Sequence, residues 1–253
     1  MSKAQEKKEN YRAHPVFERP QNRQSMIWRY MDFTKFVSML AHRGLYFARA
    51  DLLGDPFEGS MPKMSVAARR AFAKEHNMPG NALDGIGQFL RFSRGWTFIS
   101  SWHMNEVESA AMWQLYAKSG EAIAVRSTFE RLDECVGDTC YIGVVKYVDY
   151  DTDVIPTENL FYPYIHKRLS FAHEREVRAL IQELPTTEGK LDYQRPPSDE
   201  GRWVDVDLAA LVSDVFVAPT APDWLRPLVK DVCAKYGLDK EVRQSAISAQ
   251  PIY

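Results

Sequence analysis

Three short segments of the chain set polar side chains among apolar residues, and these polar groups could form a chemically active site. The segments are 26–30 (MIWRY), 96–102 (WTFISSW) and 173–181 (HEREVRALI). The first contains Arg29, the second contains Ser100 and Ser101, and the third contains Glu174 and Glu176. A guanidinium binds anions, and a carboxylate stabilises positive charge that develops during bond cleavage. The three segments together therefore indicate a ligand-binding site with a catalytic carboxylate.

The two glutamates are predicted to share one face of a strand, because residues two apart on a strand point to the same side. Cleavage of a glycosidic bond passes through an oxocarbenium-like state, which a nearby carboxylate stabilises. We expect Glu176 to act in this way through the ribose hydroxyls, and Glu174 to orient an acceptor or hold the site together. The alternative is that both pair with basic neighbours on a solvated surface, namely Lys167, Arg175 or Arg178.

Arg29 lies between two aromatic residues, Trp28 and Tyr30. Aromatic neighbours desolvate and orient a guanidinium, which suits bidentate contact with a phosphate. We therefore assign Arg29 and Tyr30 to cofactor binding. The alternative is an edge-strand arginine that pairs with Asp32 or Asp55.

The paired serines end a hydrophobic run, and Ser100 and Ser101 are predicted to face opposite sides of their strand. Either hydroxyl could bind the amide of a nicotinamide or fix the catalytic glutamate, so both are assigned to cofactor binding. The alternative is a hydroxyl that bonds its own backbone where the strand ends. His103 follows directly and is expected to be a catalytic proton shuttle, since imidazole titrates near neutral pH.

A loop rich in charged and aromatic residues, 46–58 (YFARADLLGDPFE), could form the rim of a ligand pocket or a plain surface loop with an Asp-Pro turn. Arg49 in this loop is assigned to cofactor binding. A different enzyme, a metal-dependent nuclease, would instead gather the acidic residues Asp51, Asp55, Glu58 and Glu176. No His-Glu-x-x-His motif or Cys/His cluster accompanies them, so we expect no metal.

The composition is that of a soluble globular protein, since 45% of the 253 residues are apolar and 26% are charged. The formal charge of −2 does not favour a dedicated nucleic-acid binder, although a local basic patch stays open. The three cysteines lack Cys-x-x-Cys spacing, and neither a signal peptide nor an apolar run of about 20 residues is recognisable. We therefore expect a cytoplasmic protein that does not enter a membrane.

Hydrophobic periodicity and turn residues predict a polar N-terminal arm over 1–25 and one α+β domain over 26–253. Its centre is expected to be a mostly antiparallel or mixed sheet flanked by helices. The predicted strands are 26–30, 45–48, 96–102, 122–127, 141–150, 174–182 and 212–217. The predicted helices are 33–42 (capped by Asp32 and ended by Gly44), two within 64–94, 105–118, 129–135, 161–173 and 223–236. Residues 185–203 are expected to form a long exposed loop.

Several longer segments together resemble one bacterial and prophage family, which is identified only as domain of unknown function 2971. They are 45–58 (LYFARADLLGDPFE), 108–116 (ESAAMWQLY), 120–125 (GEAIAV), 141–147 (YIGVVKY), 167–180 (KRLSFAHEREVRAL) and 215–245. The resemblance covers roughly residues 26–248. It implies a common fold and a soluble bacterial protein, without implying an activity.

The ordered polar residues also resemble those of ADP-ribosyltransferases of the Arg-Ser-Glu type. Arg29 matches the arginine of their first strand, 98–101 (FISS) resembles their serine strand, and 174–177 (EREV) resembles their Glu-x-Glu strand. This resemblance implies an ADP-ribosyltransferase-like fold, NAD as a co-substrate and an unknown acceptor of ADP-ribose. A role in conflict between phage and host would suit such an enzyme. The alternative is a non-catalytic binding or regulatory protein on the same scaffold.

Overall fold

A nine-stranded sheet lies at the centre of the protein, whose computed structural model describes residues 14–116, 120–138, 140–197, 200–249 and 251. Its strands are β1 (Met26–Asp32), β2 (Gly44–Arg49), β3 (Thr97–Met104), β4 (Ala122–Thr128), β5 (Tyr141–Val144), β8 (Glu176–Gln182), β11 (Gly201–Asp205), β12 (Asp214–Val217) and β13 (Val242–Gln244). The main path runs β11-β2-β3-β1-β4-β12-β13, while β8 joins β3 to β5. Only the β12–β13 pair in this sheet is parallel among the described strands. The predicted single α+β domain with a mixed, mostly antiparallel sheet and flanking helices is confirmed.

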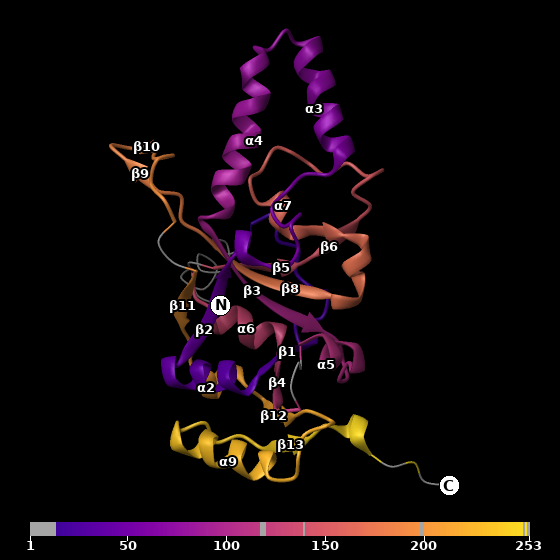
Figure 1. Cartoon of the computed structure of the whole chain (residues 1–253), viewed down its shortest axis with the longest axis vertical. Coiled ribbons are helices and arrows are strands. Elements are labelled where there is room, and N and C mark those ends of the chain that lie inside the picture. The colour runs from indigo at the N-terminus through magenta and orange to yellow at the C-terminus, as the bar shows by residue number, and fades with distance from the viewer. Residues whose placement is uncertain (1–13, 117–119, 139, 198–199, 250, 252–253) are drawn as a thin grey trace, which may run out of the picture.

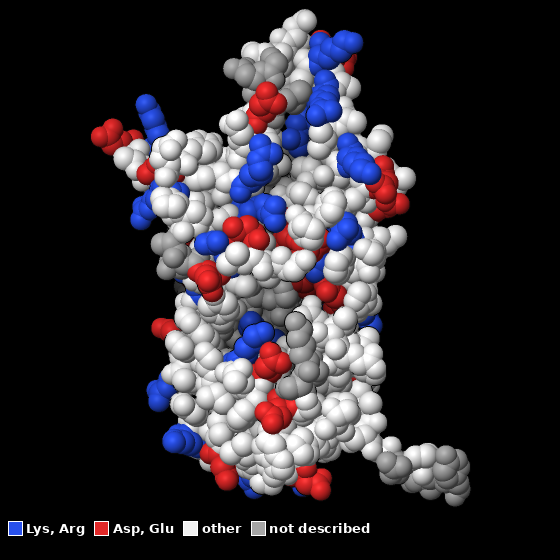
Figure 2. Space-filling view, in the orientation of Figure 1, with Lys and Arg blue, Asp and Glu red and all other residues white. Residues whose placement is uncertain are grey.

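Helices surround this sheet, and two of them project from it as a hairpin (Figure 1). The helices are α2 (Phe33–His42), α3 (Lys63–Glu75), α4 (Gly80–Arg94), α5 (Ala110–Tyr116), α6 (Phe129–Cys135), α7 (Tyr162–Ile165), α8 (Leu208–Leu211) and α9 (Leu225–Lys235). Short elements complete the chain: the 3-10 turns η1 (Ala50–Leu52), η2 (Leu169–Glu174) and η3 (Ala246–Ser248), and the strands β6 (Lys146–Val148), β7 (His166–Arg168), β9 (Thr186–Thr187) and β10 (Lys190–Leu191). The α3–α4 hairpin lies at the opposite end of the molecule from α9 and carries much of the basic surface of one face (Figure 2). Within the described ranges, no helix has the length and hydrophobicity needed to cross a membrane.

The sheet is split next to β3. One edge of β3 pairs with β8 from Thr97 to His103. Its other edge pairs with β2 only at residues 98–99 and with β1 only at residues 103–104. Because β1 and β2 separate between these points, the edge of β3 at residues 100–102 faces a gap rather than a third strand. Such a gap can admit side chains and a ligand into the plane of the sheet.

Alternation along β1 directs its side chains into two separate cores. Ile27 and Met31 belong to the largest core, which α2, α6 and α9 cover. Trp28 and Tyr30 point the other way and pack with α5. Arg29 shares the side of Ile27 and Met31 by the period of two, and there it reaches the gap between β1 and β2. The strand therefore carries one charged side chain into an otherwise apolar region.

Helix α2 spans the predicted residues 33–42, but its capping differs from the prediction. The apolar residues Phe36, Met39 and Leu40 are buried, which follows from their spacing of three and four. Asp32 occupies the N-cap position without a side-chain capping hydrogen bond, and it pairs with Lys35 instead. The helix ends at Arg43 in the left-handed conformation (φ 50°), one residue before the predicted Gly44.

Around residues 161–182, the observed elements differ from those predicted from the sequence. The predicted helix 161–173 is divided into α7, β7 and η2, and residue 174 still belongs to the 3-10 turn. Arg175 then adopts a left-handed conformation (φ 41°), and β8 starts only at Glu176. The prediction that both glutamates lie on one strand is therefore wrong, because Glu174 ends the 3-10 turn and the left-handed Arg175 separates it from β8.

Two further stretches differ from the prediction. One expected loop contains a strand, and one expected strand is divided in two. The end of the predicted exposed loop 185–203 joins β11, which pairs with β2 along the sheet edge. The predicted strand 141–150 is divided into β5, in the large sheet, and β6, which pairs with β7 in a separate two-stranded sheet.

The predicted N-terminal arm contains a segment that packs on the domain. Residues 1–13 lie outside the described part of the chain, but Val16 and Phe17 are buried. The Phe17 ring stacks on Tyr141 with a centroid distance of 5.2 Å and meets Phe161 edge-on at 5.3 Å. A Cβ atom at Gly143 would lie 2.9 Å from the Phe17 backbone, so glycine is required for this close approach. The structured domain thus begins before residue 26.

We expect Phe17→Ala to lower the free energy of unfolding by about 3 kcal/mol, because it removes a large side chain from a packed aromatic cluster. Urea unfolding followed by circular dichroism measures this. Leu52→Ala is the matched control, since Leu52 is 53% exposed, and it should change the value by less than about 0.5 kcal/mol. A similarly small effect of Phe17→Ala would show that the segment does not stabilise the domain.

Candidate ligand-binding and catalytic site

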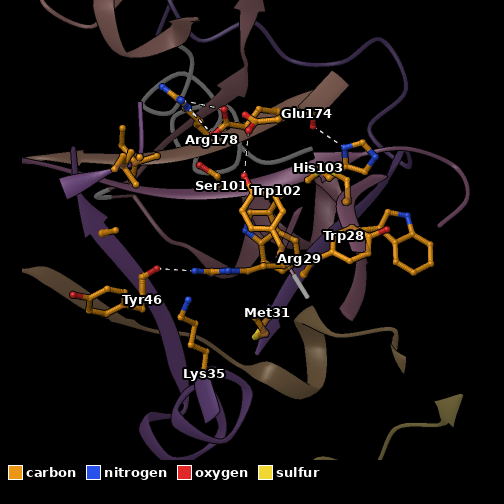
Figure 3. A pocket seen from close by; sticks show the side chains of 18 of the residues that line it. Trp28, Arg29, Met31, Lys35, Tyr46, Ser101, Trp102, His103, Glu174 and Arg178 are labelled. Carbon is orange, nitrogen blue, oxygen red and sulfur yellow. Dashed lines mark hydrogen bonds and ion pairs between the residues drawn. The ribbon is translucent and has the colours of Figure 1, made fainter. Parts of the chain in front are cut away.

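A cavity of about 670 Å³ opens where β1 and β2 separate. A volume of this order suits a small-molecule ligand. Strands β1, β2, β3 and β8 contribute to its wall, together with α2 and the loops before α3 and β8. It gathers six of the predicted site residues, which are Arg29, Tyr30, Ser101, His103, Glu174 and Glu176. Figure 3 shows Arg29 and Arg178 on opposite sides of this space.

Arg29 is a cation without a carboxylate partner among the described residues. Its guanidinium donates hydrogen bonds to the Ser100 hydroxyl and to the Tyr46 carbonyl, both at 2.9 Å, so it bridges the gap from β1 to β3 and β2. Its Cζ lies 5.8 Å from the centroid of the Trp102 ring. Burial lowers the pKa of Arg29 to about 10, which leaves it charged at neutral pH. An unbalanced positive charge on a cavity wall favours an anionic ligand.

The alternative partners expected for Arg29 are occupied elsewhere. Asp32 pairs with Lys35 at 3.6 Å, and Asp55 pairs with Arg168 at 2.7 Å. The expectation of a surface ion pair at Arg29 is therefore not met in the described structure.

Arg178 is the centre of a buried charge cluster. Its Nε and Nη2 donate to Glu176 at 2.9 and 3.0 Å, and its Nη1 and Nη2 donate to Glu58 at 2.6 and 2.7 Å. Nη1 also donates to the Tyr164 carbonyl at 2.5 Å. These contacts use all five N–H groups of the guanidinium. A fully buried arginine is tolerated only with such complete pairing.

A second cation, Lys167, completes the cluster. It forms ion pairs with Glu174 and, at 3.3 Å, with Glu176. The cluster thus holds three carboxylates, Glu58, Glu174 and Glu176, against the two cations Arg178 and Lys167. Glu176 is ionised in this cluster, whereas burial outweighs the charge of Arg178 at Glu58 and raises the pKa of that carboxyl. The two predicted glutamates do meet, but through Lys167 rather than through a shared strand face.

Glu176 stays ionised in this setting. Burial by itself would raise its pKa, but the charges of Arg178 and Lys167 outweigh burial and lower the pKa to about 2. A hydrogen bond with the Ser101 hydroxyl acts in the same direction. The backbone N–H of Glu176 donates to the Tyr147 hydroxyl at 2.8 Å, which further fixes the start of β8. The result is an anionic, positioned carboxylate on the cavity wall.

The paired serines lie on opposite sides of β3, as predicted. Ser100 is buried and accepts the hydrogen bond from Arg29. Ser101 is exposed to the cavity and contacts Glu176. One serine therefore positions the cation and the other positions the carboxylate.

His103 holds the turn that carries Glu174. Its Nδ1 lies 2.6 Å from the Glu174 carbonyl, which can only accept, so this nitrogen carries a proton. Its Nε2 is buried without a described partner, and burial lowers the pKa of the ring. Opposite it in register on β8 is Glu176. This geometry gives His103 a positioning role, and its predicted role as a proton shuttle stays a prediction.

Tyr30 and Arg49 differ in their relation to the cavity. Tyr30 lines it and accepts a hydrogen bond from the Ser109 N–H at 2.9 Å, and burial raises the pKa of its phenol to about 12. Arg49 is not among the lining residues, and its Nε donates to Asp51 at 2.6 Å. The geometry thus supports the assignment of Tyr30 to a ligand site and gives no support to that of Arg49.

The four acidic residues proposed for a nuclease face cations rather than a common metal position. Asp51 pairs with Arg49, Asp55 with Arg168, and the two glutamates with Arg178. In the described parts of the chain, no group of three or more His, Cys, Asp or Glu side chains is arranged to hold a metal ion. The arrangement gives the nuclease hypothesis no support.

Sequence reasoning missed several residues of the site. Glu58 was considered as part of a pocket rim or as a metal ligand. Lys167 and Arg178 were considered only as surface partners, although the alternation Glu176-x-Arg178 within an apolar strand signals a buried ion pair. Tyr116 also belongs to the site, since its hydroxyl donates to Glu174 at 3.2 Å. No local signal points to the Tyr46 carbonyl as a partner of Arg29.

We expect Arg178→Ala to lower the free energy of unfolding by about 3 kcal/mol or more, because it leaves two buried carboxylates without their shared cation. Thermal and urea unfolding measure this. Lys146→Ala is the control, since its pair with Glu18 at 2.5 Å is solvent-exposed and should contribute less than about 1 kcal/mol. Equal effects of the two variants would contradict the importance of the buried cluster.

The lowered pKa of Glu176 also predicts an acid dependence of stability. The contribution of this carboxylate is fully present above its ordinary pKa of 4.5 and is lost as the pH falls through about 2. The wild type should therefore lose free energy of unfolding between these pH values more steeply than Glu176→Gln, which cannot take up that proton. Urea unfolding at a series of pH values tests this, and identical slopes would refute it.

The chain was compared with known proteins after this geometry was established. No protein-family model matches it, and no match was found among curated proteins or among solved structures. The family resemblances inferred from the sequence therefore stay predictions.

Proposed function

We propose that the protein is an ADP-ribosyltransferase-like enzyme that cleaves the glycosidic bond of NAD and transfers ADP-ribose to an acceptor. One observation carries this proposal: Arg29, which has no carboxylate partner among the described residues, and the ionised carboxylate Glu176 line the same cavity. The predicted resemblance to enzymes of the Arg-Ser-Glu type rests on the same residues.

The charges of the cavity complement those of NAD. The diphosphate of NAD is anionic and matches Arg29, while the nicotinamide ring is cationic and matches the ionised carboxylate of Glu176. Positive charge moves onto the ribose as the glycosidic bond breaks, and a preorganised carboxylate stabilises that transition state. The cavity therefore favours both the binding of the substrate and its cleavage.

The reaction would proceed as follows. The bond between ribose C1′ and the nicotinamide nitrogen breaks, and its electron pair leaves with nicotinamide. Glu176, held by Arg178 and Ser101, stabilises the oxocarbenium-like ribose. A lone pair of the acceptor forms the new bond at C1′, and the acceptor loses a proton. Glu174 would orient this acceptor.

The second candidate is a binding protein that recognises NAD without cleaving it. Both carboxylate oxygens of Glu176 already accept hydrogen bonds from Arg178, which favours a structural role for this carboxylate. Such a protein would serve as a sensor or regulator. The two candidates differ in turnover, not in binding.

The cellular setting is part of the same proposal. We propose a cytoplasmic bacterial protein of the domain of unknown function 2971 family that acts in conflict between phage and host. Cys135, Cys140 and Cys233 are free thiols, which suits a reducing compartment.

The test is incubation of the purified protein with adenine-labelled NAD, with and without a bacterial lysate. The proposal expects free ADP-ribose or labelled macromolecules with the wild type. Glu176→Gln should slow turnover by about 100-fold or more while it still binds NAD in calorimetry. Glu183→Gln is the matched control, because Glu183 directly follows β8 and pairs with Arg202 in solvent.

Each outcome identifies one candidate. Turnover that depends on Glu176 supports the transferase. Binding of NAD without turnover in the wild type supports the sensor. An intact fold that neither binds nor cleaves NAD would overturn both.

A further inference from the structure

The end of the cavity at Arg29 contains an aromatic surface that the catalytic proposal does not use. Trp203 of β11 lines the cavity and remains 36% exposed. It lies directly opposite Tyr46 in the β11–β2 register, and the two ring centroids are 5.3 Å apart. The Tyr46 carbonyl is the group that binds Arg29. A large, partly exposed ring and the Arg29 guanidinium therefore line the same cavity and share Tyr46 as a neighbour.

The Trp203 indole packs against two other rings, those of His42 and Tyr46. The His42 ring stacks on it with a centroid distance of 4.0 Å and an interplanar angle of 5°. Tyr46 meets it at a tilt of 58° with a centroid distance of 5.3 Å. The Tyr46 ring itself crosses Gly201, where a Cβ atom would lie 2.4 Å from the ring. This packing holds the two rings in place, and the indole that lines the cavity is partly exposed and flat, which suits stacking with a planar group.

A second cation, Lys35 of α2, lies at the same end of the cavity. It lines the cavity, and Figure 3 shows its side chain directed toward the Arg29–Tyr46 hydrogen bond. Its one described ion pair, with Asp32, is long at 3.6 Å, and the Lys35 side chain is 75% exposed. Two cations beside a flat ring match a molecule in which a planar base is joined to phosphate groups.

We propose that Trp203, with Arg29 and Lys35, forms a nucleotide subsite in which a purine base stacks on the indole and the diphosphate lies against the two cations. This inference rests on the proposed function and gives the substrate its orientation. The adenine half of NAD lies toward β11, and the nicotinamide half lies toward Glu176. The opposite orientation would place the cationic nicotinamide ring at the Arg29 end and the neutral adenine beside Glu176.

The test measures binding of ADP-ribose and of ribose 5-phosphate by calorimetry. ADP-ribose contains the base, and ribose 5-phosphate lacks it. Trp203→Ala should weaken binding of ADP-ribose by roughly tenfold or more, because stacking on an aromatic side chain contributes at this scale. It should leave binding of ribose 5-phosphate unchanged, and Trp203→Phe should restore most of the affinity for ADP-ribose.

Trp224→Ala is the matched control, because Trp224 is 54% exposed and does not line the cavity. It should bind both ligands like the wild type. Circular dichroism confirms that each variant is folded, and quenching of tryptophan fluorescence by ADP-ribose should be lost only in the Trp203 variants.

The outcomes separate this inference from the catalytic proposal. If Trp203→Ala binds ADP-ribose as tightly as the wild type, the subsite is overturned while NAD binding and cleavage can still stand. If the wild type binds neither ADP-ribose nor NAD, both the subsite and the proposed function are overturned.

Discussion

The buried guanidinium of Arg178 is the constraint on which the site depends. A charge in the interior is destabilising unless every donor is paired, so the surrounding chain must supply five acceptor contacts in fixed positions. They come from Glu176 on β8, from Glu58 in the loop before α3, and from the Tyr164 carbonyl of α7. Glu58 lies more than 100 residues before the other two segments, and all three meet at this one guanidinium. The same contacts keep Glu176 ionised and immobile, so stability and the chemistry of the carboxylate have one cause.

The split of the sheet beside β3 explains why a cavity exists in so well-packed a core. Continuous pairing of β1, β3 and β2 would have buried residues 100–102 in a ladder of hydrogen bonds. Instead β1 and β2 separate, and Arg29 bridges them through the Ser100 hydroxyl and the Tyr46 carbonyl. The backbone carbonyl and the hydroxyl satisfy the guanidinium without neutralising it. Its charge is therefore left for a ligand, which is the physical basis of the functional argument.

Local sequence patterns predict much of the fold and part of the site, and tertiary contacts decide the rest. The apolar spacing in α2 and the β-branched and aromatic run of β3 are local, so both elements could be predicted from them. The grouping of Arg29, Ser101 and Glu176 follows from antiparallel pairing of their strands. The position of Glu174 could not be predicted, because contacts with Lys167 and His103 favour a 3-10 turn over a longer strand. Trp203 could not be predicted either, because its strand forms only by pairing with β2, more than 150 residues earlier.

The closed charge cluster also limits how this protein can evolve. Residues 58, 167, 174, 176 and 178 share hydrogen bonds so completely that replacing one of them leaves its partners buried and unpaired. A single substitution then lowers the free energy of unfolding strongly, and only a second substitution can restore it. Lineages that keep this fold are expected to inherit the five positions as a block, or to exchange several of them together for apolar residues and abandon the anionic end of the cavity. The residues at these five positions would thus indicate, for any descendant, whether the original chemistry has been retained.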